Sequence, residues 1–365
     1  LTGTITPTLV FDLAANFSPL TATASRPSPT RIVFETNVVT PTAVAGNAYA
    51  ATMTFSSVVD DVGNPQTPPS VVFAGVADTI SPTVTSLVYN RSAQRYMGAD
   101  TFQVTVTFAE AIGPTAPTLV ISGGSGVGND VGATSMTSVL GQTVWTFSRS
   151  VSGGGVDDGA FSLTLTAADP SGNVMTAQPP NSTFYIDSVA PGGPTLTFSR
   201  GPAYVKGGAW KITADFTEPI TSGVTPTLTF NVPANITPTP AVPVRLSSTQ
   251  IVYATTATGT TADGGTPYSA TVDHTTVLDL AGNPQPAPDV TASGLVDTVA
   301  PHAPGLTFSR GPTYLTTGPL TVTVTANEPL TSTITPTLTF SLPGFFSPAS
   351  PVSYRLTGSG DTVFV

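Results

Sequence analysis

The strongest constraint on this chain is a sequence unit of about 110 residues that recurs along its whole length. Each copy contains an alternating segment that ends in a carboxylate, as in Phe216-Thr217-Glu218-Pro219-Ile220. Glu110 and Glu328 hold the place of Glu218 in the copies before and after it. Domains of about 100–150 residues are the commonest size, and each can bury a core of its own. The repeat therefore predicts a tandem array of small domains.

Two further elements recur with the same period. Turns of the form Asp-x-x-Gly-Asn begin at Asp60, Asp169 and Asp279, one in each of three successive copies. Short joints with a proline four positions on begin at Asp78, Asp187 and Asp297, again at the period of the repeat. Proline fixes the backbone angle φ, so we expect these joints to be stiff connections.

The joints divide the chain into two complete and two partial repeats. We predict domains at 1–78, 79–187, 188–297 and 298–365. Residues 1–9 match residues 330–338, so the first repeat lacks its first strands and the last repeat lacks its last ones. We expect the natural chain to continue beyond both ends. The alternative is that neighbouring copies of the chain complete the partial domains.

Hydrophobic periodicity predicts an all-β fold. Within the repeat 188–297 we expect seven strands, at 195–199, 209–216, 225–231, 241–246, 250–256, 267–273 and 290–296. In the second of these, Trp210, Ile212, Ala214 and Phe216 alternate with polar residues, and the segments 102–108 and 320–326 repeat the pattern. Alternation with one apolar face is typical of an antiparallel sheet that is covered on one side. Seven such strands in a unit of this length predict a two-sheet sandwich.

Composition limits the classes of function. Charged residues make up 9% of the chain and its formal net charge is −10, whereas soluble domains average about 25% charged residues. We expect no nucleic-acid partner, because such proteins need a basic face, and no membrane insertion in this segment. The chain has no cysteine, which excludes thiolate metal sites. A surface rich in Thr, Ser, Pro and Gly suits a protein outside the cell.

Three motifs in a fixed order carry a resemblance to a known family. A joint such as Asp297-Thr298-Val299-Ala300-Pro301, a strand that ends in Phe-x-Glu-Pro and a late Asp-x-x-Gly-Asn turn resemble the bacterial immunoglobulin-like repeats of very large extracellular, adhesin-type proteins. The resemblance covers essentially the whole chain, although Ala111 replaces the proline found at Pro219 and Pro329. It implies tandem seven-strand immunoglobulin-like (Ig-like) β-sandwiches in an elongated array and export to the cell surface or the medium. It implies no particular ligand.

The expected topology gathers carboxylates at one pole of each sandwich. The loops after the second and sixth strands lie at the end where the chain enters, beside the joint. We expect one set to consist of Asp78, Glu110 and Asp169 and a second of Asp187, Glu218 and Asp279. Asp297 and Glu328 begin a third set whose last member would follow Val365. Partly buried carboxylates need hydrogen bonds or a cation, and an all-oxygen cluster fits Ca²⁺. Ca²⁺ at the domain junctions is therefore one of two interpretations of these sets.

Hydrogen bonding alone is the alternative to a metal. In that interpretation Asp279 starts an Asx-type turn, and Glu218 accepts backbone N–H groups from Gly282 and Asn283. No ion is then required.

The sequence does not favour an enzyme. Only two histidines are present, His274 and His302, in different repeats and without a flanking nucleophile motif, so we expect both at the surface. Acidic pairs such as Asp157-Asp158 lie in loops of repeated scaffold rather than in one cleft. A recurring arginine, at Arg91, Arg200 and Arg310, is expected to pair with a carboxylate or a turn carbonyl; contact with a neighbouring molecule is the alternative.

We therefore expect a structural segment of a stalk, fibre or sheath that spaces or mediates adhesion. Neighbouring copies of the chain, or a cell-surface or host ligand, are the partners such a segment could have. The alternative is a carbohydrate- or protein-binding adhesin module. Trp145 and Trp210 both lie in strand-like patterns rather than in loops, which argues against aromatic-rich binding loops.

Overall fold

The computed structural model describes residues 7–364 except 40–41, 56–57, 68–69, 303, 332, 334, 343, 349 and 354–362. All of the named elements in this part of the chain are β-strands. No helix among the described residues has the length and apolar character needed to cross a lipid bilayer. The chain divides into two compact units, Leu1–Val189 and Ala190–Val365. The domain boundaries at 78, 187 and 297 stay a prediction, and the matching segment 1–6 and Val365 lie outside the described residues.

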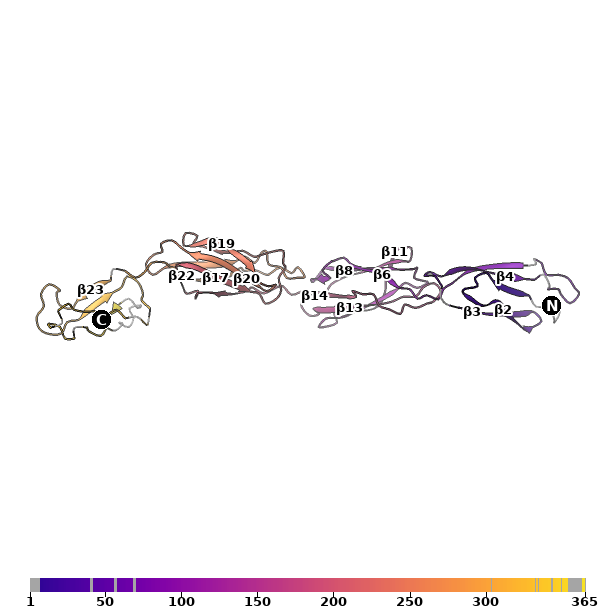
Figure 1. Ribbon diagram of the computed structural model, residues 1–365, viewed down its shortest axis with the longest axis horizontal. Coiled ribbons are helices and arrows are strands. Elements are labelled where there is room, and N and C mark those ends of the chain that lie inside the picture. Colours follow the sequence, from indigo (N-terminus) through magenta and orange to yellow (C-terminus); the bar gives the residue numbers. More distant parts are fainter. Residues whose placement is uncertain are drawn as a thin grey trace. The chain divides into compact units, whose positions relative to one another are not determined.

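The second repeat is a sandwich of two sheets (Figure 1). One sheet has the order β11-β12-β8-β6 and consists of β6 (Val84–Tyr89), β8 (Thr101–Phe108), β11 (Thr137–Leu140) and β12 (Val144–Ser150). The other has the order β10-β9-β13-β14-β7 and consists of β7 (Arg95–Tyr96), β9 (Thr118–Gly123), β10 (Val131–Ser135), β13 (Gly159–Thr166) and β14 (Thr183–Ile186). In immunoglobulin nomenclature these sheets are A-B-E-D and C-F-G with additional edge strands. This strand order makes the repeat an Ig-like sandwich.

The third repeat has the same topology except that it has no counterpart of β10 among the described residues. One sheet, ordered β15-β17-β20-β19, consists of β15 (Thr195–Phe198), β17 (Gly208–Asp215), β19 (Ile236–Arg245) and β20 (Gln250–Ala257). The other, ordered β16-β22-β21-β18, consists of β16 (Tyr204–Lys206), β18 (Leu228–Phe230), β21 (Thr266–Val272) and β22 (Val290–Asp297). All seven predicted strands are present, although β18 is shorter and β19 longer than expected. The prediction of an all-β array of Ig-like sandwiches is confirmed.

Within the described ranges the second repeat has nine strands and the third has eight, whereas seven were predicted for each; β7 and its counterpart β16 are among the additional ones. β7 and β16 are very short, and each runs parallel to the last strand of its repeat, β14 or β22. Such a short segment carries no measurable alternation, so pattern reading cannot find it.

The recurring arginine holds the chain at the connection to this strand. Arg200 donates through Nη1 to the carbonyl oxygens of Lys206 (3.1 Å) and Gly207 (3.3 Å). Arg310 makes the same pair of bonds in the last repeat, to the carbonyl oxygens of Thr316 and Thr317. Arg91 instead forms an ion pair with Asp100, with 2.6 Å between Nη2 and Oδ1. The expected pairing with turn carbonyls or a carboxylate is confirmed.

Among the described residues, the two end repeats contain fewer strands. In the first, the sheet order is β3-β2-β1-β4-β5, from β1 (Thr8–Phe11), β2 (Phe17–Ser28), β3 (Arg31–Val38), β4 (Asn47–Thr54) and β5 (Ser70–Ala77). In the last, the order is β23-β24-β25, from β23 (Gly305–Phe308), β24 (Val322–Thr325) and β25 (Val363–Phe364). Strands β1, β4 and β5 correspond in sequence to the C, F and G strands of the complete repeats.

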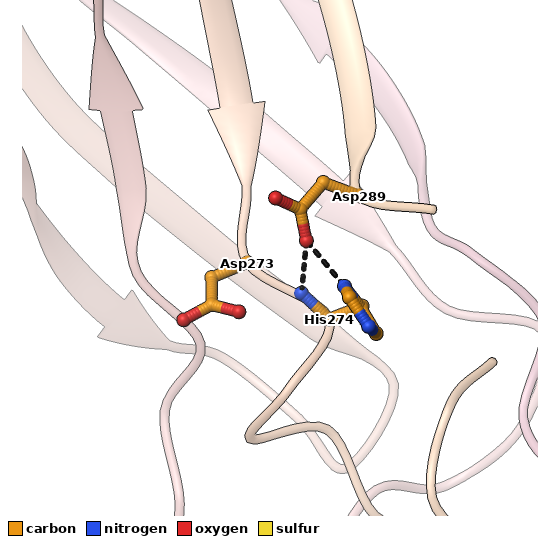
Figure 2. A group of neighbouring side chains, drawn as sticks. All are labelled: Asp273, His274 and Asp289. Carbon is orange, nitrogen blue, oxygen red and sulfur yellow. Dashed lines mark hydrogen bonds and ion pairs between the residues drawn. The ribbon is translucent and has the colours of Figure 1, made fainter. Parts of the chain in front are cut away.

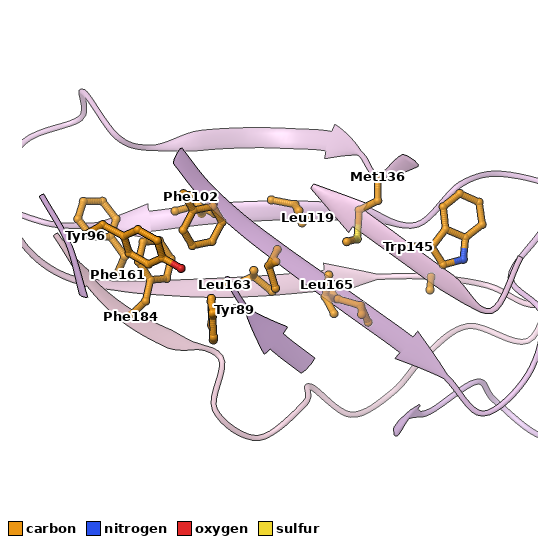
Figure 3. Packing of buried hydrophobic residues seen from close by; sticks show 14 of the residues in the cluster. Tyr89, Tyr96, Phe102, Leu119, Met136, Trp145, Phe161, Leu163, Leu165 and Phe184 are labelled. Atoms are coloured by element: carbon orange, nitrogen blue, oxygen red, sulfur yellow. The ribbon is translucent and has the colours of Figure 1, made fainter. Parts of the chain in front are cut away.

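Each complete repeat buries its own apolar core. In β8 the predicted inward residues Phe102, Val104, Val106 and Phe108 are all buried. Figure 3 shows the core of this repeat, which includes Phe161 and Phe184, whose rings stack with centroids 5.5 Å apart. A separate cluster fills the third repeat around Trp210. Because the cores are separate, each repeat can fold on its own apolar interactions.

We expect Phe161→Ala to destabilise the second repeat by about 3–5 kcal/mol, the usual cost of truncating a buried phenylalanine. Trp145 lies in that repeat and is one of only two tryptophans in the chain. Its fluorescence, followed during denaturant unfolding in a Trp210→Phe background, therefore reports this repeat alone. Val139 is 59% exposed, so Val139→Ala serves as the control and should change stability by less than about 0.5 kcal/mol. Equal effects of the two substitutions would refute the core assignment.

Candidate metal centre

Three carboxyl groups of the first predicted set lie together in the first compact unit. Asp78 follows β5, Glu110 follows Phe108 at the end of β8, and Asp169 lies in the turn after β13. One carboxylate oxygen from each lies within 4.8 Å of the others. Glu110 is 3% exposed and Asp169 is fully buried. The predicted convergence at the entry end of the sandwich is therefore found for this set.

The turn that carries Asp169 is fixed by the aspartate itself. Asp169 Oδ1 accepts the backbone N–H groups of Ser171 (2.8 Å) and Asn173 (2.9 Å), and Oδ2 accepts the Asn173 side chain (2.7 Å). The backbone N–H of Gly113 donates to the carbonyl of Ala168 (3.0 Å), which ties the loop after β8 to this turn. Two loops that are distant in sequence are thus held side by side.

The joint residue Asp78 is held by the repeat before it. Thr42 donates through Oγ1 to Asp78 Oδ1 (3.3 Å) and accepts the backbone N–H of Thr79 (3.0 Å). Asp78 Oδ1 also accepts the N–H of Ile80 (3.0 Å). From the repeat after it, Asn173 donates through Nδ2 to the Asp78 carbonyl (3.2 Å).

Glu110 reaches across the joint. Its Oε2 accepts the backbone N–H of Ala45, in the preceding repeat, at 3.2 Å. Its other oxygen, Oε1, is buried and has no hydrogen-bond partner among the described residues. Burial raises the pKa of Glu110, and the neighbouring Asp78 and Asp169 carboxylates raise it further. The site therefore disfavours a bare negative charge on Glu110.

The same contacts recur at the last joint, within the second compact unit. Thr261 donates to Asp297 Oδ1 (3.3 Å) and accepts the N–H of Thr298 (3.0 Å). Glu328 Oε2 accepts the backbone N–H of Gly264 (3.1 Å), and Glu328 Oε1 is likewise buried without a partner in the described chain. Asp297 and Glu328 line the same cleft.

The second set is divided between the two compact units. Asp187, whose backbone N–H donates to the Tyr96 carbonyl (2.9 Å), belongs to the first unit. Glu218 and Asp279 belong to the second, with carboxylate oxygens within 4.8 Å of each other. The joining of all three residues stays a prediction.

The hydrogen-bonding alternative is confirmed for the aspartate and stays a prediction for Glu218. Asp279 Oδ1 accepts the N–H groups of Ala281 (2.8 Å), Gly282 (2.7 Å) and Asn283 (2.9 Å), as expected for an Asx-type turn. For Glu110 and Glu328 the donor comes from the preceding repeat, because each glutamate lies at a domain boundary.

Sequence reasoning also missed the loop that supplies those donors. It has the form Thr-Ala-x-x-Gly, at 42–46 and again at 261–265. Gly46 and Gly265 have φ angles of 76° and 92°, in the left-handed region that favours glycine. The recurrence of this motif two repeats further along the chain is the signal that could have identified it.

A further cluster lies in the third repeat and contains Asp273, His274 and Asp289 (Figure 2). Asp289 accepts the His274 backbone N–H (2.9 Å) and contacts the imidazole Nδ1. The His274 N–H and side chain lower the pKa of Asp289. Asp273 accepts the N–H (2.8 Å) and hydroxyl (2.6 Å) of Thr275. His274 and Asp289 are thus paired with each other and Asp273 with Thr275, which explains the cluster without a metal. His302 is exposed, as expected, whereas His274 is only half-exposed.

No family model matches the sequence, and no curated protein matches it. Among solved structures the chain is similar to tandem Ig domains of titin, at 11% identity and a TM-score of 0.20, over 60% of this chain and 97% of that one. It is also similar to Dpr2 Ig1–Ig2 in its complex with DIP-Theta, at 11% identity and a TM-score of 0.30, over 81% of this chain and 90% of that one. An ICAM-5 ectodomain fragment gives 14% identity and a TM-score of 0.32 over 83% and 72% of the two chains. At these TM-scores the similarities carry no functional argument, and the Ig-like assignment rests on strand order.

We expect Asp279→Ala, measured in chelator, to destabilise the third repeat by at least about 2 kcal/mol, because it leaves several buried N–H groups without an acceptor. Asp60 heads an equivalent turn with the same bonds to Asn64, but that turn is exposed. Water can replace the lost acceptor there, so Asp60→Ala should cost the first repeat clearly less. Urea unfolding of the two variants compares them, and equal losses would contradict the buried-turn explanation.

Proposed function

We propose that this chain is a structural segment of an exported surface protein, in which successive Ig-like sandwiches are held at defined joints so that they space or present other parts of the molecule. One observation carries the proposal: two joints, at Asp78 and Asp297, are built from the same hydrogen bonds. Thr42 and Ala45 make them at one joint, and Thr261 and Gly264 make them at the other. A flexible tether would need no such bonds.

The burial of these contacts supports a mechanical role. Thr42 and Thr261 are both buried, as are Glu110 and Glu328. A buried N–H, hydroxyl or carboxylate that loses its partner costs about 1–3 kcal/mol. Bending either joint would break several such contacts at once. The joints therefore favour one arrangement of the sandwiches on either side of them.

Composition supports the same proposal. With 9% charged residues, 36 prolines and 34 glycines, the chain resembles a scaffold whose surface is solvated by hydroxyl and amide groups. Proline-rich joints and edge strands such as β19 also leave few extended segments available to proteases or to aberrant strand pairing. The adhesin-type origin comes from the sequence resemblance and belongs to the proposal.

Small-angle X-ray scattering of the full chain tests the spacer role. Strands of eight to ten residues at about 3.3 Å per residue give about 30 Å per repeat, so the maximum dimension should be roughly 100 Å or more. The radius of gyration should clearly exceed the ~21 Å of a compact globule of this length. A value close to that of the globule would refute the spacer. Specific binding on a glycan array would instead favour the carbohydrate-binding alternative.

Thr261→Val tests the joint directly, since valine keeps the shape of threonine and removes the hydroxyl. The Thr298 N–H loses its acceptor, at a cost of about 1–1.5 kcal/mol, so its hydrogen exchange should accelerate roughly tenfold. Thr36→Val is the matched control, because the Thr36 hydroxyl bonds the Pro19 carbonyl within one hairpin. Unchanged exchange at Thr298 in Thr261→Val would show that the hydroxyl does not secure the joint.

A further inference from the structure

We propose that Asp78, Glu110 and Asp169 form a divalent-cation site, of the all-oxygen type that Ca²⁺ occupies, which closes the joint between two sandwiches. This site is an addition to the proposed spacer role. The hydrogen bonds of the joint support that role even without a metal. It is formed only when both repeats are folded, since Asp78 ends the first and the other two ligands come from the second.

The three carboxylates lack the partners that would neutralise them. One oxygen from each lies within 4.8 Å of the others. In the part of the chain that the structure describes, no lysine or arginine is within ion-pair distance of Asp78, Glu110 or Asp169. Like charges this close repel strongly where water is excluded, and Glu110 and Asp169 are both buried. A bound cation or a shared proton must relieve that repulsion.

A second observation points to a ligand rather than to a structural cluster. Glu110 is 3% exposed, and its Oε1 is without a partner among the described residues although Oε2 is bonded to the Ala45 N–H. Buried polar atoms are rarely left unsatisfied in native proteins. Glu328, at the equivalent place in another joint, is 4% exposed and has the same unpartnered Oε1 and the same bond to the preceding repeat through Oε2. The same buried glutamate oxygen thus lacks a hydrogen-bond partner at two joints, which indicates that this oxygen is a cation ligand.

The chemistry of the cluster favours Ca²⁺ over Mg²⁺. One carboxylate oxygen from each residue lies within 4.8 Å of the others, so a single ion about 2.3–2.6 Å from each oxygen can bridge them. Mg²⁺ loses its water ligands reluctantly and is seldom held by protein oxygens alone. The ligands are hard oxygens, and the chain contains no cysteine that would select a softer metal. Backbone carbonyls or water would complete the six to eight ligands that Ca²⁺ usually takes.

Calorimetric titration of the chelator-stripped full chain with CaCl₂, and separately with MgCl₂, tests the proposal. Glu110→Gln and Asp78→Asn should each bind one Ca²⁺ fewer than the unaltered chain. They should also lose a matching part of the rise in melting temperature that Ca²⁺ produces. Asp60→Asn is the control: Asp60 has the same turn bonds as Asp169 but lies in an exposed turn, so its variant should keep the full stoichiometry. Mg²⁺ should bind more weakly.

Two outcomes would overturn the site. The first is equal Ca²⁺ stoichiometry in Glu110→Gln, Asp78→Asn and the unaltered chain. The second is no Ca²⁺ binding by the unaltered chain together with a higher melting temperature of Glu110→Gln at neutral pH, which would mean that the carboxyls share a proton. Small-angle X-ray scattering in excess chelator tests the spacer proposal separately. If the chain is extended without bound metal, the spacer proposal holds even when the cation site is refuted.

Discussion

Burial of carboxylates at the entry end of the second, third and last repeats is the constraint on which the joints depend. A buried carboxylate must be bonded, paired or neutralised, and the partners found here belong to a loop or to a neighbouring repeat. Asp169 organises its own turn through Asn173. Glu110 takes an N–H from Ala45 of the repeat before it. Hydrogen bonds to these carboxylates order the loops within a repeat, and those that cross a joint order the connection between two repeats.

The cores and the joints are stabilised by different interactions. Each complete repeat has its own apolar cluster, around Phe102 and Phe184 in one and Trp210 and Tyr268 in the other. The joints depend on a few polar contacts, including those of Thr42 in one joint and of Thr261 in another. A domain can therefore fold on its own core, while its connection to a neighbour depends on polar contacts. This separation is consistent with the spacer role proposed above.

Sequence periodicity predicted the fold class because alternation is imposed by the geometry of a strand that is covered on one face. The inward positions of β8 and β17 followed directly from it. It could not predict β7 or β16, whose parallel pairing with β14 and β22 depends on a crossover rather than on local pattern. It also could not predict that Ala45 and Gly264 donate to Glu110 and Glu328, because contacts between repeats leave no trace in the periodicity of one repeat.

The sequence by itself determined the repeat length, the alternating core positions and the identity of the acidic residues near each joint. These follow from local chemistry and from recurrence. The expected topology also predicted that Asp78, Glu110 and Asp169 gather at one pole, and one oxygen from each lies within 4.8 Å of the others. Only the tertiary structure decided that Oε1 of Glu110 and of Glu328 is buried without a partner among the described residues. The reason is physical: the burial of a charged group and its hydrogen-bond partners depend on which atoms of separate loops and repeats pack around it, and the sequence does not record that packing.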